Sequence, residues 1–284
     1  MALVGHYATN SAIYTHSMKL SIVIVNYKMW QLTRALVESL LKDSLPPGTE
    51  IIVVDNNSGD DSVYLLRSDF PEITVIDNKT NLGLAAGVNT ALKVAKGSYY
   101  LVLNPDMIAI PGAVQKLVTF MDQNPKVGIA GGKLISPNGK LQYSCYRFYT
   151  AMTIIYRRTF LGKTKRGREE IRSFLMKDFD HAAEKDVDWL MGACLIVRKK
   201  SYEEVGGMDE RFFLYFEDVD WCRRFWEHGW RVTYVPQAVF SHFHQRSSEG
   251  GALRGIFANR PTREHIKSAC KYFWKFWGKQ LPNR

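Results

Sequence analysis

The chain has 284 residues, of which 46% are hydrophobic and 23% charged, and it carries a formal net charge of +10. This composition suffices for a sizeable core in one or two domains, and no apolar run approaches the roughly 18 residues that span a bilayer. The start of the chain lacks the pattern of a signal peptide, and the four cysteines form no C-x-x-C pair, so we expect a cytoplasmic protein without a disulfide framework or a structural zinc site.

The first half of the chain alternates apolar strands with helical patterns. Residues 1–18 show no useful periodicity, and we treat them as an extension outside the fold. The strands expected after them are 20–27, 50–58, 73–76 and 99–103, and the helices are 31–42 and 85–95. Apolar strands that alternate with helices predict an α/β fold whose mostly parallel sheet is covered on both faces.

Polar side chains follow these strands at the point where each one ends. They are Asn26, Asp55-Asn56 and Asn104 with Asp106. Ligands of parallel sheets bind beyond the carboxyl ends of the strands, so we expect these side chains to border one cleft. A dinucleotide-binding oxidoreductase is disfavoured, because Asn26-Tyr27-Lys28-Met29 lacks the glycines that let a pyrophosphate approach the backbone.

The second half of the chain is less regular. A helix at 111–123, a strand at 127–134 and a turn at 137–139 are expected first. The basic, aromatic segment 145–185 is predicted to be an insertion or a mobile loop. Regular structure is expected again at 188–197, and 230–235 is predicted to be the last strand, ending before Pro236. The glycine-rich piece 249–255 suits a lid over a substrate.

One stretch, 212–224, places three acids in an aromatic and apolar run. Loss of solvation raises the pKa of such carboxylates toward values that are useful for proton transfer. If a helix begins near Glu217, Asp218 lies on its inner edge and Asp220 about 200° away, so those two acids do not act as a pair. The alternative is that Glu217 and Asp218 only cap a helix N-terminus.

The ordered set of motifs resembles the family 2 glycosyltransferases with the GT-A fold, and within them the rhamnosyltransferase-like branch. The resemblance runs from about Ser21 to the 242–248 region. It is carried by 53–58 (Val-Val-Asp-Asn-Asn-Ser), Asn81-Leu82-Gly83 with Asn89, Asn104-Pro105-Asp106, Gly192-Ala193-Cys194, 206–210 (Gly-Gly-Met-Asp-Glu), 216–220 (Phe-Glu-Asp-Val-Asp) and His242.

The resemblance implies transfer of a sugar from a nucleoside diphosphate donor, with inversion at the anomeric carbon. It implies Asp218 as the general base and Asp106, helped by His242, as ligands of Mg²⁺ or Mn²⁺. The donor-binding residues that it implies are Asn26, Asp55, Asn56, Asn81 and Gly83. A carboxylate and phosphate oxygens suit such a cation, which stabilises the leaving diphosphate, and an imidazole ligand favours Mn²⁺.

Asn104 stands where much of the wider family has an aspartate, and the rhamnosyltransferase-like branch often shows the same Asn-Pro-Asp triplet. An amide at this position can bind a ribose or a metal-bound water but brings no charge. Arg246 is a further candidate for the diphosphate, against the alternative of a solvated arginine.

Four residues are candidates for the acceptor side. Trp189 and the Gly192-Ala193 turn could line it, with ordinary strand-end packing as the alternative. Glu217 could bind the acceptor or shape the pKa of Asp218.

Basic residues crowd into 157–172 and the tail after Arg260 without a nucleic-acid-binding signature, so we expect no nucleic acid partner. The tail 266–279 mixes aromatics with lysines, which favours either peripheral contact with the inner face of the cytoplasmic membrane or a helix docked on the domain or in a homodimer.

We expect one continuous domain, with an extension at 1–18, a nucleotide-sugar half at 19–125, an acceptor and catalytic half at 126–255 and a helical tail at 256–284. The branch resemblance implies a deoxysugar donor, rhamnose on thymidine diphosphate, and a lipid-linked or polysaccharide acceptor in cell-surface glycan synthesis. The alternatives are a sugar nucleotidyltransferase and a catalytically silent carbohydrate-binding scaffold.

Overall fold

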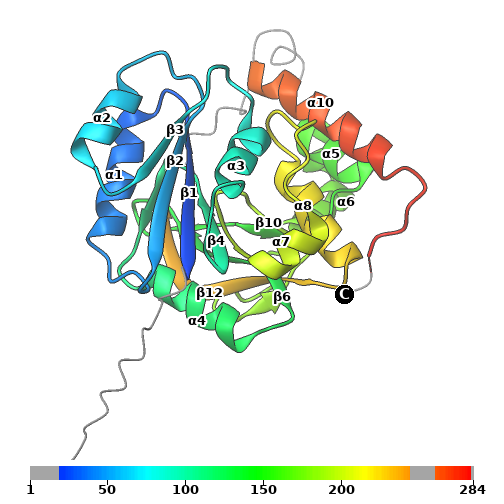
Figure 1. Cartoon of the computed structure of the whole chain (residues 1–284). Coiled ribbons are helices and arrows are strands. Elements are labelled where there is room, and N and C mark those ends of the chain that lie inside the picture. The colour runs from blue at the N-terminus through cyan, green and yellow to red at the C-terminus, as the bar shows by residue number, and fades with distance from the viewer. Residues whose placement is uncertain (1–18, 244–259, 283–284) are drawn as a thin grey trace, which may run out of the picture.

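The computed structural model describes residues 19–243 and 260–282. The expectations for 1–18, for the 249–255 lid and for Arg246 therefore lie outside the described residues. In the described part, a ten-stranded mixed sheet runs through the molecule and helices cover both of its faces (Figure 1). The main strand order is β3-β2-β1-β4-β11-β6-β12-β5, with β7 beside β6 and β9 beside β12.

The first half of the chain forms the parallel part of the sheet, as predicted. Its strands are β1 (Leu20–Asn26), β2 (Thr49–Asp55), β3 (Thr74–Asp77) and β4 (Tyr99–Leu103). Its helices are α1 (Trp30–Leu41), α2 (Ser62–Asp69), α3 (Leu84–Leu92) and α4 (Ala113–Gln123), with the short strand β5 (Met107–Ala109) before α4. Helix α2 was not predicted, because only Ser62 and Leu66 of its eight residues are buried and its apolar pattern is short.

The second half adds strands to the same sheet. They are β6 (Val127–Ile135), β7 (Leu141–Gln142), β9 (Lys185–Asp186), β11 (Cys194–Arg198) and β12 (Arg231–His242). Strand β11 runs antiparallel to both β4 and β6, whereas β12 runs parallel to β6. The carboxyl ends of β1 to β4, β6 and β12 therefore lie at one edge of the sheet, together with the start of β11.

The segment 145–185 is not the loop that the sequence predicted. It contains β8 (Cys145–Tyr146), α5 (Ala151–Arg158), the 3₁₀ helix η1 (Phe160–Lys163) and α6 (Lys165–Phe174), and β8 pairs with β10 (Trp189–Leu190). Thr150 and Thr153 form a capping box at the start of α5. The aromatic residues of this segment pack on one another and on Trp189, which weak helical periodicity could not reveal.

The last strand also extends beyond its predicted end. β12 continues through Pro236 to His242, with a shift in its pairing to β6 between Val235 and Val239. A proline cannot donate to the ladder, and a bulge removes that requirement locally. The extension carries His242 to a position beside β5, where it pairs with Met107.

Two apolar clusters fill the space between the sheet and its helices. Ile22 and Ile24 of β1 pack with the cluster that includes α1 and α4, whereas Val23 and Val25 pack with the cluster that includes α3. Successive side chains of a strand point to opposite faces, so both faces of β1 are buried. This explains why the strand reads as a continuous apolar run.

The remaining helices are α7 (Lys199–Val205), α8 (Glu217–Glu227) and α10 (Arg260–Lys275). Helix α10 lies along α8 on the same side of the molecule as α5 and α6 (Figure 1). Lys275 of α10 binds both Asp209 and Asp220, at 2.7 and 2.5 Å. Within 19–243 and 260–282, no helix is both long enough and apolar enough to cross a membrane.

Candidate active site

The predicted site residues of the first half meet at the carboxyl edge of the sheet. Asn26 lies directly opposite Asp55, which in turn lies opposite Asp77. The backbone N–H of Asn104 donates to the carbonyl of Ala193 at 3.0 Å, so the loop after β4 is joined to the turn before β11. Register in a buried sheet is strongly specified by its two apolar faces, and that register fixes which polar side chains become neighbours.

Asn26 and Asp55 form a buried network with two hydroxyl residues. The amide of Asn26 donates to Asp55 Oδ2 at 2.6 Å and to Ser58 Oγ at 3.1 Å. Thr33 Oγ1 donates to Asn26 Oδ1, and Ser58 donates from its N–H and its Oγ to the Asp55 carboxylate. Both Asn26 and Asp55 are almost fully buried. Their described contacts rigidify the floor of the site, and their contact with a donor stays a prediction.

Asn56 organises the loop that contains Asn81 and Gly83. Its amide donates to Asn81 Oδ1 at 3.1 Å and to the carbonyl of Gly83 at 3.0 Å. Its oxygen accepts from Asn78 Nδ2 and from the N–H of Leu82. All four hydrogen-bonding positions of this buried amide are thus used. Asn56 holds the loop, and Asn81 remains half-buried beside it.

Gly83 joins this loop to the acidic stretch. It precedes α3 with φ of +85°, and a Cβ there would lie 2.5 Å from the carbonyl oxygen of Phe213. That same carbonyl accepts from the N–H of Leu84 at 2.9 Å. Only glycine combines the left-handed backbone with this close approach. The predicted donor wall and the segment that leads to Asp218 therefore touch.

Asp106, in the loop before β5, faces His242, at the end of β12. Asp106 Oδ2 lies 3.4 Å from His242 Nε2. On the other side of the ring, Gln142 Oε1 lies 2.8 Å from His242 Nδ1, while Gln142 Nε2 donates to the His242 carbonyl at 3.0 Å. The second bond fixes the orientation of the Gln142 amide, so Nδ1 is the donor in the first. In the neutral imidazole, the lone pair of Nε2 then points toward a carboxylate oxygen.

That arrangement fits a divalent cation. A carboxylate oxygen and an imidazole nitrogen converge on one point, and an oriented amide fixes the tautomer that a metal requires. The pair does not form a complete cage, since no group of three or more His, Cys, Asp or Glu residues gathers among the described residues. The remaining ligands have to come from the substrate or from water.

Asp218 lies in the first turn of α8, as the sequence predicted. Tyr215 and Phe216, just before the helix, both have left-handed backbones with φ of +68° and +70°. Such strain in non-glycine residues costs on the order of 1–3 kcal/mol each and clusters at functional sites. Asp218 Oδ2 accepts from the N–H of Gly192 at 2.9 Å, and Oδ1 accepts from the N–H of Val219 at 2.8 Å.

The two adjacent acids have different environments. Burial raises the pKa of Asp218 to about 6, and the two backbone hydrogen bonds oppose that rise. Glu217 is only 4% exposed, and among the described residues its Oε2 has no hydrogen-bond partner. Burial and then the charge of Asp218 raise the pKa of Glu217 well above its usual range. Burial thus disfavours the charged form of both acids, and Asp218 has two backbone N–H groups that stabilise its carboxylate.

The residues predicted for the acceptor side differ in accessibility. Gly192 contacts Asp218 directly. Ala193 is 1% exposed and belongs to the core, and Trp189 stacks on Tyr146 with ring centroids 4.3 Å apart. Trp189 also donates from its indole N–H to the carbonyl of Arg147. Neither Trp189 nor Glu217 presents much surface in this structure, and their acceptor role stays a prediction.

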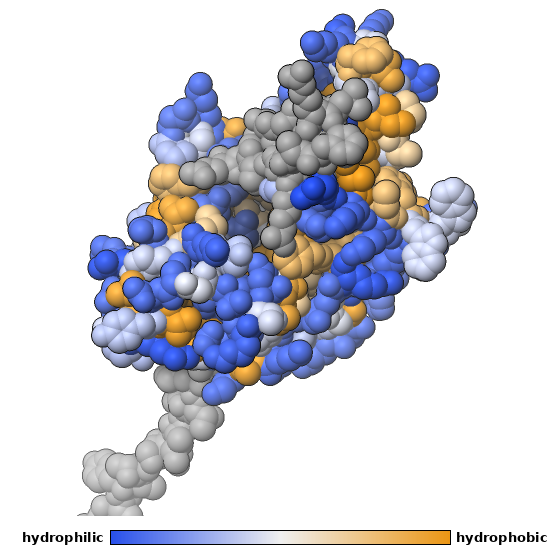
Figure 2. All heavy atoms as spheres, turned by 90° about the horizontal axis from the view of Figure 1, so that it is seen from above, coloured by the Kyte–Doolittle hydropathy of each residue, from blue (hydrophilic) through white to orange (hydrophobic). Residues whose placement is uncertain are grey.

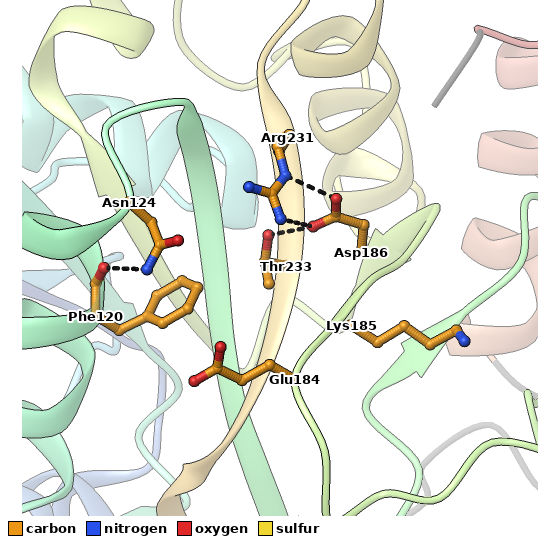
Figure 3. Close-up of a pocket in the computed structure, with 7 residues that line it drawn as sticks. All are labelled: Phe120, Asn124, Glu184, Lys185, Asp186, Arg231 and Thr233. Carbon is orange, nitrogen blue, oxygen red and sulfur yellow. Dashed lines mark hydrogen bonds and ion pairs between the residues drawn. The ribbon is translucent and has the colours of Figure 1, made fainter.

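A surface cavity lies away from these residues. It has a volume of about 340 Å³ and its lining includes Asp186, Arg231 and Thr233, at the start of β12 (Figure 3). His242 is at the other end of that strand, roughly 35 Å away at ~3.3 Å per residue. Arg231 is already paired with Asp186 at 2.7 Å. This cavity is therefore separate from the residues described above.

Three residues that hydrogen-bond the predicted site residues were not identified from the sequence: Gln142, Ser58 and Thr33. Gln142 lies in a two-residue strand, 100 positions before the histidine that it orients. No local pattern marks such a residue. Ser58 was part of a recognised motif, but its bond to Asp55 follows from the turn after β2, which only the structure shows.

The chain was compared with known proteins. The sequence profile of the family described as "Glycosyl transferase family 2" matches residues 21–206. N-acetylglucosaminyl-diphospho-decaprenol L-rhamnosyltransferase of Mycobacterium tuberculosis is 28% identical over 243 residues, which cover 81% of this chain and 78% of the relative. Rhamnosyltransferase WbbL of Escherichia coli is 26% identical over 264 residues, covering 88% and 91% of the two chains.

Among solved structures, GalNAc-T7 with UDP, GalNAc and Mn²⁺ superposes with a TM-score of 0.65 at 15% identity. The superposition covers 93% of this chain and 49% of that one, so this chain spans about half of that structure. At this level of identity the likeness concerns the fold.

Proposed function

The chain belongs to glycosyl transferase family 2 as a rhamnosyltransferase-like glycosyltransferase with the GT-A fold, and from that premise we propose an inverting transfer of a deoxysugar to a lipid-linked acceptor in cell-surface glycan synthesis. The proposed donor is rhamnose on thymidine diphosphate. The activities of the two relatives support the sugar, and the mycobacterial relative also supports an acceptor attached to a prenyl diphosphate. Donor binding is assigned to residues 19–125 and acceptor binding to 126–255.

The observation that carries this proposal is the environment of Asp218. A base for an acceptor hydroxyl has to be ionised at working pH and yet retain affinity for a proton. A pKa of about 6 meets both requirements, and the Gly192 and Val219 N–H groups hold the carboxylate in one orientation. The raised pKa of Glu217 disfavours a second negative charge beside Asp218.

In the proposed reaction, the acceptor hydroxyl oxygen forms a bond to the anomeric carbon while the bond from that carbon to the diphosphate oxygen breaks. The hydroxyl proton passes to the Asp218 carboxylate, and the nucleoside diphosphate leaves with the bonding electron pair. A single displacement from the opposite face inverts the anomeric configuration. Proton acceptance by a positioned carboxylate contributes ~10²–10⁴-fold in rate.

Asp106 and His242 are the proposed holders of Mg²⁺ or Mn²⁺, with Gln142 orienting the imidazole. A cation there would offset the negative charge that develops on the leaving diphosphate. Asn104, next to this pair in the loop after β4, is proposed to bind the ribose or a metal-bound water. The similarity to a structure that contains Mn²⁺ supports a divalent metal.

We also propose that α10 touches a membrane surface. Trp274 and Trp277 are 77% and 81% exposed, and the helix carries several lysines. Tryptophans at headgroup depth with cations for anionic lipid are typical of interfacial helices. A lipid-linked acceptor makes such contact useful.

One experiment tests the function. The full chain is incubated with dTDP-rhamnose, Mn²⁺ and an N-acetylglucosaminyl diphosphate carried on an isoprenoid, and the products are analysed by mass spectrometry and NMR. The proposal expects release of dTDP and one added deoxyhexose of inverted configuration. A nucleotidyltransferase would instead release pyrophosphate from a nucleoside triphosphate and sugar phosphate. Absence of transfer with every nucleotide sugar and acceptor tried, in a protein that still binds carbohydrate, would favour the silent scaffold.

A further inference from the structure

Two adjacent arginines at the end of α5 have no carboxylate partner among the described residues. Arg157 is exposed; it donates to the hydroxyl of Tyr149 at 2.8 Å, and its guanidinium lies 4.9 Å from the centre of the Phe174 ring. Arg158 is half-buried. A half-buried guanidinium group is normally paired, so Arg158, with the charge of Arg157 beside it, offers a site that an anionic ligand could neutralise.

The two arginines produce a positive potential that acts on their neighbours. Burial lowers the pKa of Arg158, and the charge of Arg157 lowers it further. His265 of α10 has a pKa of about 3, lowered by burial, by Arg158 and by Arg157. The histidine is therefore neutral at physiological pH, and the positive charge of this site comes from the arginines. Tyr215 and Phe216 pack against His265, with ring centroids 5.3 Å from its own in both cases.

Two aromatic side chains connect Arg157 to the segment that carries the proposed base. Tyr149, which accepts from Arg157, packs against Phe216 with ring centroids 4.9 Å apart. Phe216 is two residues before Asp218. The pKa of Tyr149 is raised by burial and by the charge of Asp218 and is lowered by both arginines, so the phenol lies within electrostatic range of all three groups.

The position of α5 is firmly fixed. Glu170 of α6 accepts from the hydroxyls of Thr150 and Thr153 at the start of the helix, at 3.2 and 2.7 Å. The arginine pair thus lies at the end of a short helix whose start is held by α6. Preorganised guanidinium groups bind phosphate oxygens in bidentate geometry, which a diphosphate can satisfy twice.

We propose that Arg157 and Arg158 bind the diphosphate of the lipid-linked acceptor while its sugar hydroxyl reaches Asp218. This inference rests on the proposed function, because it assigns the anionic part of the acceptor to that site. In a sugar linked through its anomeric oxygen to a diphosphate, the anion lies one ring away from the reacting hydroxyl. Arg157 and the Asp218 segment are connected through Tyr149 and Phe216, and two charged groups placed apart in this way suit such a molecule.

The surface beside the arginines fits the rest of an amphiphile. Met152 and Ile155 of α5 are about 40% exposed, and Phe160 of η1 is 79% exposed. In Figure 2, apolar side chains gather among hydrophilic ones on the side of the molecule where Figure 1 places α5, α6 and α10. The isoprenoid would contact these exposed apolar side chains beyond the diphosphate.

A donor diphosphate would have the same chemistry, so the experiment compares the two sources. Wild type, Arg158→Ala and Arg157→Ala/Arg158→Ala are assayed with two acceptors, N-acetylglucosaminyl diphosphate on a short isoprenoid and a neutral alkyl N-acetylglucosaminide of equal chain length. The proposal expects the ratio of kcat/KM for the charged over the neutral acceptor to fall about 10- to 100-fold, as for lost hydrogen bonds to a charged group. The donor KM should stay at the wild-type value.

Arg166→Ala is the matched control, because it removes an equal charge from the exposed surface of α6 in the same basic segment. It should leave the acceptor ratio unchanged. Arg158→Lys should recover part of the ratio, since a lysine restores the charge without the bidentate fork. Thermal melting of each variant verifies folding, and Arg158→Ala should melt at least as high as wild type because it relieves repulsion within the pair.

Three results would overturn the inference: an unchanged acceptor ratio in folded variants, an equal loss with Arg166→Ala, or an increase in donor KM that accounts for the loss. A binding measurement separates this failure from failure of the proposed function. Calorimetric titration of the charged acceptor, with dTDP already saturating the protein, should show weaker binding to Arg158→Ala than to wild type, whether or not any donor supports turnover. Equal binding counts against the arginine site alone.

Discussion

Gly192 and Asp218 are joined by a 2.9 Å hydrogen bond, in which the backbone N–H of the first donates to Oδ2 of the second. The neighbouring residue Ala193 accepts from the N–H of Asn104 at 3.0 Å. The turn that precedes β11, formed by Gly192 and Ala193, thus connects the acidic helix α8 to the loop that follows β4. The proposed base and the proposed metal-binding loop are held in fixed relation by two backbone groups.

Asp218→Asn should lower kcat by ~10²–10⁴-fold, because an amide cannot accept the hydroxyl proton. The dissociation constant of the donor, measured by calorimetry, should change little.

Asp220→Asn, in the same helix, is the matched control. Asp220 is fully buried and binds Arg224 at 2.8 Å and Lys275 at 2.5 Å. Its loss should cost ~3–5 kcal/mol of stability and leave turnover per folded molecule close to normal. Retained turnover in Asp218→Asn would remove this residue from the role of base.

The pH dependence should separate the two adjacent acids. Turnover should rise as pH increases through about 6, because Asp218 acts as its carboxylate. Glu217 has a folded pKa well above its ordinary value of 4.5, so its contribution to stability is complete below that value and declines as pH rises. Glu217→Gln resembles the neutral acid and should remove that decline. The melting temperature of Glu217→Gln should therefore rise relative to that of wild type as the pH increases above 4.5. If the melting temperatures of Glu217→Gln and wild type changed with pH in the same way, the pKa of Glu217 would not be raised.

Gln142→Leu should weaken Mn²⁺ binding about 10- to 100-fold, because the His242 ring loses the partner that fixes its tautomer. The measurements are Mn²⁺ titration followed by electron paramagnetic resonance and the Mn²⁺ concentration that gives half-maximal turnover. Asp106→Asn should have a larger effect, since it removes the charged ligand. Gln115→Leu on the exposed face of α4 should behave as wild type. Turnover that EDTA leaves unchanged would contradict the metal assignment.

Gly83→Ala should destabilise the protein more than Gly206→Ala. Gly83 has φ +85° and ψ 174°, and Gly206 has φ +84° and ψ 175°, so both variants carry the same type of backbone strain. An added Cβ at Gly206 meets nothing within 4 Å, whereas at Gly83 it collides with the Phe213 carbonyl. The difference between the two unfolding free energies isolates the collision, which we expect to exceed ~1 kcal/mol. Equal losses in chemical denaturation would show that the two segments can separate at little cost.

Trp274→Ala/Trp277→Ala should reduce sedimentation with vesicles of anionic lipid while leaving the melting temperature close to that of wild type, because both indoles are mostly exposed. Binding should also weaken with added salt, since surface charges are screened. A double substitution of the exposed residues Tyr64 and Leu82, on the other half of the molecule, controls for general loss of surface hydrophobicity. Equal sedimentation of all three proteins, or sedimentation of none, would count against membrane contact through α10.

The sequence alone determined the parallel half of the sheet and the place of the acidic helix. The apolar runs of β1, β2 and β4 are long enough to require burial on both faces, and such strands in alternation with helices leave few arrangements. Polar residues at the strand ends then had to share one edge. For these elements, burial on both faces of the sheet determines both the apolar pattern in the sequence and the position in the fold.

Only the tertiary structure decided how those residues are used. Gln142 meets His242 across 100 positions, and Arg157 approaches the base through Tyr149 and Phe216, which come from separate elements. The helices within 145–185 are stabilised mainly by aromatic packing around Trp189, so their own periodicity is weak. The pKa values of Glu217 and Asp218 likewise depend on burial by residues distant in the chain. Burial and long-range contacts are properties of the folded molecule, and no local spacing encodes them.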